Sequence, residues 1–242
     1  MTTATLTRTS AQRRDLGALS GVLYVLFFVA SLVIAGALGP SGTVTPYSSD
    51  AEVQAYRLKD PARLEDLFRI LGLLQGLSAL ALLAFVPCLA AFVRRHGSDA
   101  RAGVVRSLAT VAGALLLLSA STSWVLAQIS AKAELSTYRA VSDLSFITGA
   151  GPAIASLGVA VFLVAATGRG SHALPAWVTW SGIVIGMASV LSMSSLVAEG
   201  GSVFIPVGRF LGFVWLVVLS VLLWRRGGRT DDLSDSIAPR HL

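Results

Sequence analysis

The residues with the clearest chemical potential in this sequence are two arginines that lie inside long apolar stretches. Arg69 and Arg209 each occur within a run of apolar residues that is long enough to cross a membrane. A charged side chain in hydrocarbon is costly, so such residues usually face other protein groups or a water-filled cavity. Arg209 precedes Trp224 by fifteen residues, which is about 22 Å along a helix that rises ~1.5 Å per residue. We therefore expect Arg209 inside the ~30 Å hydrocarbon core, and Arg69 closer to its outer edge.

Other polar residues are expected at the same outer level as these arginines. Together they form a candidate polar cluster of Arg69, Gln75, Asp143, Glu199 and Arg209. One interpretation of the cluster is an outward-facing vestibule that takes an anion or a lipid headgroup. The other is structural, with Arg209 snorkelling to the headgroups or pairing with Glu199 across the short connector Gly200–Ser202. The structural interpretation is our leading one, and the sequence leaves both open.

The residue combinations that commonly carry catalysis or hold a cofactor are missing from this sequence. His96, His172 and His241 all lie in charged segments, which argues against haem ligation and against a Ser–His protease. The single cysteine, Cys88, has no partner for an intrachain disulfide. The sequence contains neither HExxH nor a phosphate-binding GxxxxGK[ST] motif. We therefore expect no cofactor and no metal, name no catalytic residue, and leave enzymatic activity uncertain with a non-enzymatic role as the leading expectation.

Six apolar stretches must position the polar cluster. Each exceeds the ~20 residues that a helix needs to cross a membrane. Only 13% of the 242 residues are charged and 54% are hydrophobic, against ~25% charged in a typical soluble domain. The sequence predicts an all-α, polytopic bundle of six transmembrane helices over residues 16–226, between a cytoplasmic tail 1–15 and a disordered cytoplasmic tail 227–242. The expected spans are about 16–38, 67–93, 104–129, 144–167, 174–197 and 203–224.

The Lys and Arg residues are distributed unevenly over the two sides of this bundle. With a cytoplasmic N-terminus, twelve of the nineteen lie on the cytoplasmic side, five on the outer side and two within spans. Short loops rich in Lys and Arg stay in the cytoplasm, which predicts that both termini and the connectors 94–105 and 168–173 face inward. The basic residues are spread over several segments without interleaved aromatic residues, so nucleic acid is not an expected partner.

Turn-forming and capping residues mark the longest outer connector, Pro40–Asp66. Ser49 and Asp50 are candidate N-caps for a short amphipathic helix through Ala51–Leu58, which Pro61 interrupts. The outer connector 130–143 is also polar and partly helix-prone. Any structure outside the spans should therefore lie mainly on the outer side.

Small, polar and helix-bending residues inside the spans predict how the helices pack. Pro87 and the segment 149–152 are expected kinks. Ser119, Thr122 and Ser123 are expected to form hydrogen bonds between helices. Small residues at a spacing of four favour close helix packing, either between helices of one chain or at a homodimer face. Packing between helices of one chain is our leading interpretation. These pairs are Gly17/Gly21, Gly72/Gly76, Ala109/Gly113, Gly182/Gly186 and Gly208/Gly212, and we expect Gly76 and Gly186 to lie against neighbouring helices.

The order of several short motifs is similar to that in a known group of proteins. The segment Ser49–Tyr56 follows the first span, and Phe92–Arg95 ends the second. Ala140–Asp143 precedes the fourth span, Leu174–Trp177 opens the fifth and Leu223–Arg226 closes the sixth. This order resembles a large family of uncharacterised bacterial, mostly actinobacterial, integral membrane proteins with six spans. The resemblance implies a six-span topology and a plasma-membrane location, and it brings neither an activity nor site residues.

Three hypotheses about function follow from these features. The leading one is a non-enzymatic structural or interaction protein of the membrane. The alternative is a small-molecule transporter or a lipid- or anion-binding protein that uses the outward-facing polar cluster, and a membrane-embedded enzyme ranks last. The expected partner is the lipid bilayer, a homo-oligomer is left open, and no soluble partner can be inferred.

Overall fold

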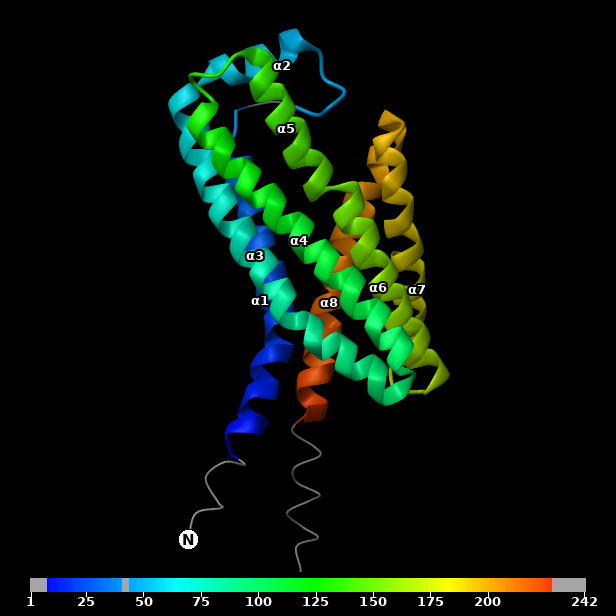
Figure 1. Cartoon of the computed structure of the whole chain (residues 1–242). Coiled ribbons are helices and arrows are strands. Elements are labelled where there is room, and N and C mark those ends of the chain that lie inside the picture. Colours follow the sequence, from blue (N-terminus) through cyan, green and yellow to red (C-terminus); the bar gives the residue numbers. More distant parts are fainter. Residues whose placement is uncertain (1–7, 41–43, 228–242) are drawn as a thin grey trace, which may run out of the picture.

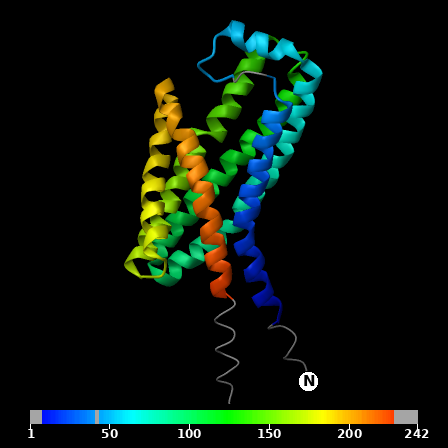
Figure 2. The same cartoon turned by 180° about the vertical axis from the view of Figure 1, so that it is seen from behind.

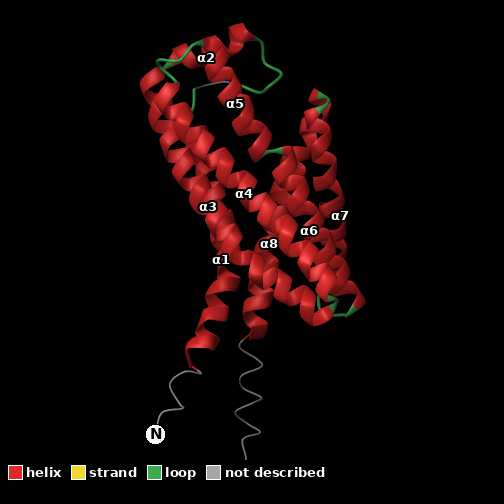
Figure 3. Ribbon diagram, in the orientation of Figure 1, coloured by secondary structure: helices red, strands yellow, loops and turns green. Residues whose placement is uncertain are grey.

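The chain folds into a bundle of long helices. The computed structural model describes residues 8–40 and 44–227, and within these ranges it contains helices and loops but no strand (Figure 3). Residues 8–15 of the predicted N-terminal tail are helical, whereas residues 1–7 and 228–242 of the two predicted tails lie outside the described residues. The long helices are α1 (Arg8–Leu38), α3 (Pro61–His96), α4 (Asp99–Ile129), α5 (Leu135–Gly149), α6 (Gly151–Gly170), α7 (Ala176–Leu191) and α8 (Phe204–Gly227).

The described part of the chain has six helical stretches that are long and apolar enough to cross a membrane. They are Gly17–Leu38, Pro61–His96, Asp99–Ile129, Leu135–Gly170, Ala176–Leu196 and Glu199–Arg225. These stretches confirm the all-α fold with six candidate spans, and the fold is that of a multi-pass membrane protein. Several helices run past the predicted span limits, because charged residues at their ends continue the helix beyond the apolar run.

The bundle consists of two packed groups of helices that α4 and α8 join. Helix α3 packs along α1 and α4, and α6 packs along α7. Helix α4 also contacts α5 and α6, while α8 contacts both α1 and α7 (Figure 1). Seen from behind, α1 and α8 lie on the same face, and the first turn of α1 and the last turn of α8 lie at the same end of the bundle (Figure 2). We call this the terminal end, and we call the opposite end the α2 end, after the short helix α2 (Asp50–Lys59) that lies across it.

The fourth span is interrupted, as the sequence predicted. Helix α5 ends at Gly149 and α6 begins at Gly151, with Ala150 in a non-helical conformation between them. Pro152 has no backbone N–H and so cannot continue the hydrogen-bond ladder of α5. Pro87, by contrast, does not interrupt its helix, since α3 is one continuous helix. Helix α3 bends in its second half (Figure 1).

The end of the fifth span differs from the predicted α-helix. After Leu191 the chain tightens into a 3₁₀ turn, η1 (Ser192–Leu196), and a second turn, η2 (Glu199–Val203), leads into α8. Ser192 and Ser195 are buried, whereas Glu199 is exposed. Glu199 therefore does not share the buried face of Ser192 and Ser195, because the α-helical period ends before it reaches Glu199.

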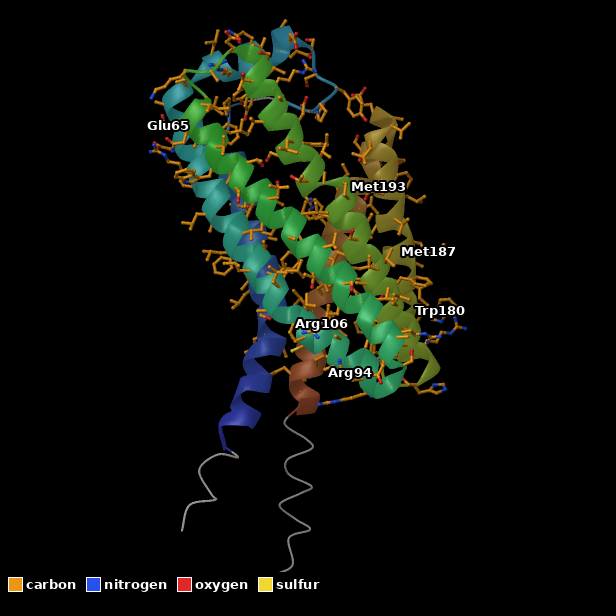
Figure 4. All side chains as sticks on the ribbon, viewed as in Figure 1. Glu65, Arg94, Arg106, Trp180, Met187 and Met193 are labelled. Atoms are coloured by element: carbon orange, nitrogen blue, oxygen red, sulfur yellow. The ribbon has the colours of Figure 1, made fainter. Side chains whose placement is uncertain are left out.

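The two ends of the bundle carry different charge. Among residues 17–40 and 44–225, the terminal end holds six arginines and a single acidic residue, Asp99. The α2 end holds six basic and eight acidic residues, several of which form ion pairs. Figure 4 shows Glu65 at the α2 end and Arg94 and Arg106 at the terminal end, while Trp180 and Met187 project outward from α7. Among these residues the terminal end is net positive and the α2 end slightly net negative, although basic residues are equally numerous at the two ends.

Helix α2 is capped and held in place by specific side chains. The predicted N-cap is confirmed at Ser49, whose hydroxyl accepts from Glu52 N while the Glu52 carboxylate accepts from Ser49 N at 2.7 Å. The hydrogen bonds that the Glu52 carboxylate accepts from the backbone N–H and the hydroxyl of Ser49 lower the pKa of Glu52. Buried Arg57 donates to the backbone oxygens of Ser130 and Ala133, at the end of α4. A cation at a helix C-terminus is favourable, so Arg57 both caps α4 and fastens α2.

Close backbone contact is concentrated where α6 crosses α7. A Cβ atom at Gly186 would lie 2.7 Å from Gly158 O, and a Cβ at Gly158 would lie 3.1 Å from Gly186 O. Gly186 therefore packs as predicted, because two glycines let the backbones touch. Gly76 also faces a neighbouring helix, but a Cβ there would meet only Ala120 Cβ, at 3.8 Å. The spacing of small residues thus identified a tight contact at Gly186 and a looser one at Gly76.

Candidate functional site

A cavity of about 250 Å³ lies between five helices in the half of the bundle toward the α2 end. Helices α1, α3, α4, α5 and α8 all contribute to its wall, and Val44 contributes from the loop before α2. All of these helices belong to candidate membrane spans. The polar part of the lining consists of Gln75, Ser119, Ser123, Ser142, Ser145 and Arg209, and the remainder is Phe28, Val44, Phe68, Leu116, Leu126, Phe146, Gly149, Ala150 and Ile205.

Arg209 provides the only formal charge in this lining. Its Nη2 donates a hydrogen bond to the backbone oxygen of Gly149, and its Cζ lies 4.7 Å from the centroid of the Phe28 ring. Phe28 is near the middle of the candidate span Gly17–Leu38, so the guanidinium lies close to mid-membrane. Within the described residues no carboxylate lies within ion-pair distance of Arg209.

The predicted pairing of Arg209 with Glu199 is therefore wrong. Glu199 lies in the exposed turn η2, and the tightening of the chain there directs it away from the bundle. The predicted snorkelling is wrong as well, because the guanidinium contacts Gly149 and Phe28 inside the bundle. What the sequence did not reveal is that a backbone carbonyl takes the place of an acidic partner.

The break between α5 and α6 explains why that carbonyl is available. The last carbonyls of a helix have no partner in their own helix, and the helix C-terminus carries a partial negative charge. In the membrane no water satisfies such groups, so they need partners from the protein or a cavity. Arg209 supplies one for Gly149, which ties α8 to the interrupted fourth span.

Serine side chains of α4 and α5 form one wall of the cavity. Ser119 Oγ donates to Ser145 O at 2.8 Å, Ser123 Oγ donates to Ser119 O at 3.0 Å, and Ser145 Oγ donates to Ser119 O at 3.2 Å. The predicted hydrogen bonds between helices are confirmed for Ser119, and Ser123 Oγ also lies 3.3 Å from Ser145 Oγ. The prediction is wrong for Thr122, whose hydroxyl bonds only to carbonyls of its own helix.

The structure brings together only part of the predicted polar cluster. Gln75 and Arg209 line the same cavity. Arg69 instead pairs with Glu65 and Asp66 on its own helix and is half exposed. Asp143 is not part of the cavity lining, and its Oδ2 lies 3.8 Å from Nε of Arg139 on the same helix, α5. With Glu199 exposed in η2, three of the five predicted residues lie away from the site.

The serines of α5 and the aromatic ring under Arg209 are site residues that sequence reasoning missed. Ser142 and Ser145 have the i, i+3 spacing of one helix face, and this spacing was the available signal. Phe28 gave no signal, because a phenylalanine within an apolar stretch is indistinguishable from a lipid-facing or core residue. Its role depends on the approach of α1 to α8.

The cavity ends at Arg209, and packed side chains follow toward the terminal end. Tyr24, Phe213 and Leu216 are almost fully buried there. Tyr24 and Phe213 make an edge-to-face contact with ring centroids 5.5 Å apart. A small space of about 20 Å³ adjoins Arg209 on this side, large enough for roughly one water. Within the described ranges no group of three His, Cys, Asp or Glu residues is placed to hold a metal ion.

These features define a multi-pass helical membrane protein with a polar, positively charged cavity among its spans. No protein-family model matches the chain, and no curated protein or solved structure is measurably similar to it. The resemblance to six-span actinobacterial membrane proteins therefore stays a prediction. Any functional conclusion depends on the chemistry of the cavity itself.

Proposed function

We propose that this protein binds a small or amphiphilic anion in the Arg209 cavity. The observation that carries the proposal is a guanidinium near mid-membrane that faces a cavity of about 250 Å³ without a carboxylate partner in the described chain. Charged groups inside membranes usually pair with an opposite charge or mark a ligand path. An anionic ligand would supply the missing charge.

The contacts of Arg209 stabilise its position but do not neutralise it. Insertion of an arginine at the centre of a transmembrane helix costs ~2.5–3.5 kcal/mol on insertion scales. A hydrogen bond to a charged donor returns ~1.5–3 kcal/mol, and a cation–π contact returns ~0.5–2 kcal/mol. These terms are similar in size, so the arginine is tolerated inside the bundle while its charge still attracts an anion.

The proposal includes an orientation and a location. We place the α2 end outside the cell and both termini in the cytoplasm of a bacterial plasma membrane. The positive-inside rule supports this orientation, because twelve of the nineteen Lys and Arg residues of the sequence lie in the segments that we place in the cytoplasm and only five in those that we place outside. The six-span resemblance described above supports the location. The cavity would then face the outer half of the bilayer.

A purely structural role is the competing proposal, and one observation favours it. Arg209 already has a carbonyl acceptor and an aromatic ring, so it serves as a brace between α8, α5 and α1. Under this alternative the protein acts as a structural or interaction partner in the membrane. An added anion would then leave its stability unchanged.

Ligand-dependent thermal stability separates the two proposals. The protein is purified in a mild detergent, and its melting temperature is measured with short-chain anionic lipids and with soluble organic anions. Occupancy at a hundred times Kd stabilises by ~2.7 kcal/mol, which for a chain of this size is a rise of roughly 5–11 °C. We expect this rise in the wild type and its loss in Arg209→Gln.

Arg69→Gln is the matched control, because Arg69 has the same charge but lies outside the cavity in a local ion pair. It should keep the wild-type response. Arg209→Lys provides a second variant in case Arg209→Gln does not fold, since it keeps the charge but loses the bidentate geometry; it should bind the anion more weakly. An anion effect that is absent from the wild type, or equal in Arg209→Gln and Arg69→Gln, would refute the proposal.

A further inference from the structure

The hydroxyl groups of the cavity wall are arranged to accept hydrogen bonds. A serine hydroxyl has one hydrogen to donate and two lone pairs to accept with. The hydroxyl hydrogens of Ser119, Ser123 and Ser145 are all accounted for by the backbone oxygens of Ser119 and Ser145. Their oxygen lone pairs remain available to a ligand in the cavity. This wall therefore favours a ligand that brings its own donors.

Two further side chains of the lining are uncommitted. Gln75 on α3 and Ser142 on α5 line the cavity, and neither makes a hydrogen bond within the described part of the chain. The amide of Gln75 can donate and accept at once, and so can the hydroxyl of Ser142. Both are partly exposed, and the surface that they expose adjoins the cavity.

Charge and volume limit the ligand further. Arg209 is the single formal charge of the lining, so a ligand with one negative charge leaves the site neutral. A space of ~10–15 Å³ on this measure holds one water, so about 250 Å³ has room for a polar headgroup of about ten non-hydrogen atoms.

We propose that the cavity selects a hydroxylated monoanion, with its phosphodiester at Arg209 and its hydroxyl groups against the serine wall. This inference rests on the proposed anion binding and specifies its ligand class. A glycerol phosphodiester has this chemistry, with one negative charge, free hydroxyl donors and about ten non-hydrogen atoms. It occurs as the headgroup of an anionic lipid and as a soluble glycerol phosphodiester, and both sources are tested below.

The test compares two lipids that differ in hydroxyl groups but not in charge. Short-chain phosphatidylglycerol and short-chain phosphatidylmethanol are both monoanionic phosphodiesters, and only the first carries hydroxyl groups on its headgroup. Affinities are measured from melting temperature against lipid concentration. We expect the wild type to bind phosphatidylglycerol at least tenfold more tightly than phosphatidylmethanol.

Ser123→Ala and Ser121→Ala form a matched pair of variants. Each hydroxyl donates to a carbonyl four residues earlier in α4, but Ser123 lines the cavity and Ser121 is exposed on another face. Ser123→Ala should lose about tenfold in affinity for phosphatidylglycerol and none for phosphatidylmethanol, while Ser121→Ala should change neither. If Ser123→Ala does not fold, Ser142→Ala provides the same comparison, because its hydroxyl makes no bond that the fold needs.

The soluble source is tested with glycerophosphoglycerol, and dimethyl phosphate serves as the control without hydroxyl groups. Binding of glycerophosphoglycerol as well as the lipid supports a soluble ligand, and binding of the lipid alone supports a membrane ligand. Equal affinities of the wild type for phosphatidylglycerol and phosphatidylmethanol would overturn this inference but leave the anion site intact. Binding that survives in Arg209→Gln would instead refute the proposed function itself.

Discussion

A methyl group added at Gly186 should destabilise the bundle, whereas the same group added at Gly76 should not. At Gly186 the new Cβ would lie 2.7 Å from Gly158 O and 2.7 Å from Phe162 Cβ. Ordinary contact begins at 3.4 Å, so α6 and α7 would have to separate by about 0.7 Å over this crossing. At Gly76 the nearest atom is Ala120 Cβ, at 3.8 Å, and nothing has to move.

The expected difference in stability follows from these contacts. Overpacking of a close contact costs ~1–3 kcal/mol, and a backbone oxygen cannot rotate away as a flexible side chain can. Replacement of glycine by alanine within a helix gains up to ~1 kcal/mol at either position. Because this gain is common to both variants, Gly186→Ala should be less stable than Gly76→Ala by ~1–3 kcal/mol.

The assay is thermal unfolding of the purified protein in a mild detergent. At ~2–4 °C per kcal/mol for a chain of this length, the melting temperatures of the two variants should differ by roughly 2–12 °C. Size-exclusion chromatography before heating shows whether either variant changes its oligomeric state, since a lost dimer with an intact protomer would assign Gly186 to a homodimer face. Equal melting temperatures would show that the α6–α7 contact can relax at no cost, and the close-packing argument would fail.

Three further predictions concern the ends of the bundle. In a cysteine-free background, Ala55→Cys on α2 should react with an impermeant thiol reagent in intact cells. Ala100→Cys on α4 should react with the same reagent only after permeabilisation. The opposite pattern would invert the proposed orientation. The lowered pKa of Glu52 means that its cap stabilises α2 above the ordinary carboxyl pKa and weakens as pH falls through the lowered value. The protection factors for hydrogen exchange at the start of α2, taken relative to the unfolded rate at each pH, should therefore fall in acid in the wild type, beyond the change seen in Glu52→Gln. Arg57→Met should expose α2 to exchange by removing two charge-assisted hydrogen bonds, at a cost of ~3–6 kcal/mol; unchanged protection would show that α2 is held by its apolar contacts alone.

The membrane-spanning fold was predictable because it depends on local composition. A run of ~20 apolar residues has few alternatives to a transmembrane helix, and the cap at Ser49 is equally local. The break before Pro152 was predictable for the same reason, since the missing N–H of proline acts on its own helix. These features depend on residues that are neighbours in the sequence.

The site was less predictable because its partners are distant in sequence and partly made of backbone. Arg209 was identified by its depth, but its acceptor is the carbonyl of Gly149, and a carbonyl leaves no trace in residue type. The search for an acidic partner therefore led to Glu199, which the 3₁₀ turn places outside the bundle. Arg69, at the edge of its span, forms an ion pair with Glu65, one helical turn away.

The hydrogen bond from Arg209 to Gly149 also bears on how the chain is made. The last span carries a charge whose acceptor belongs to the fourth span, and spans are synthesised in chain order. The interrupted helix that accepts its hydrogen bond is therefore synthesised before Arg209. The insertion cost of the arginine, ~2.5–3.5 kcal/mol at a helix centre, is thus met by a neighbour rather than by lipid. A chain whose fourth span enters late should leave its C-terminal helix stranded at the membrane surface, where quality-control proteases act.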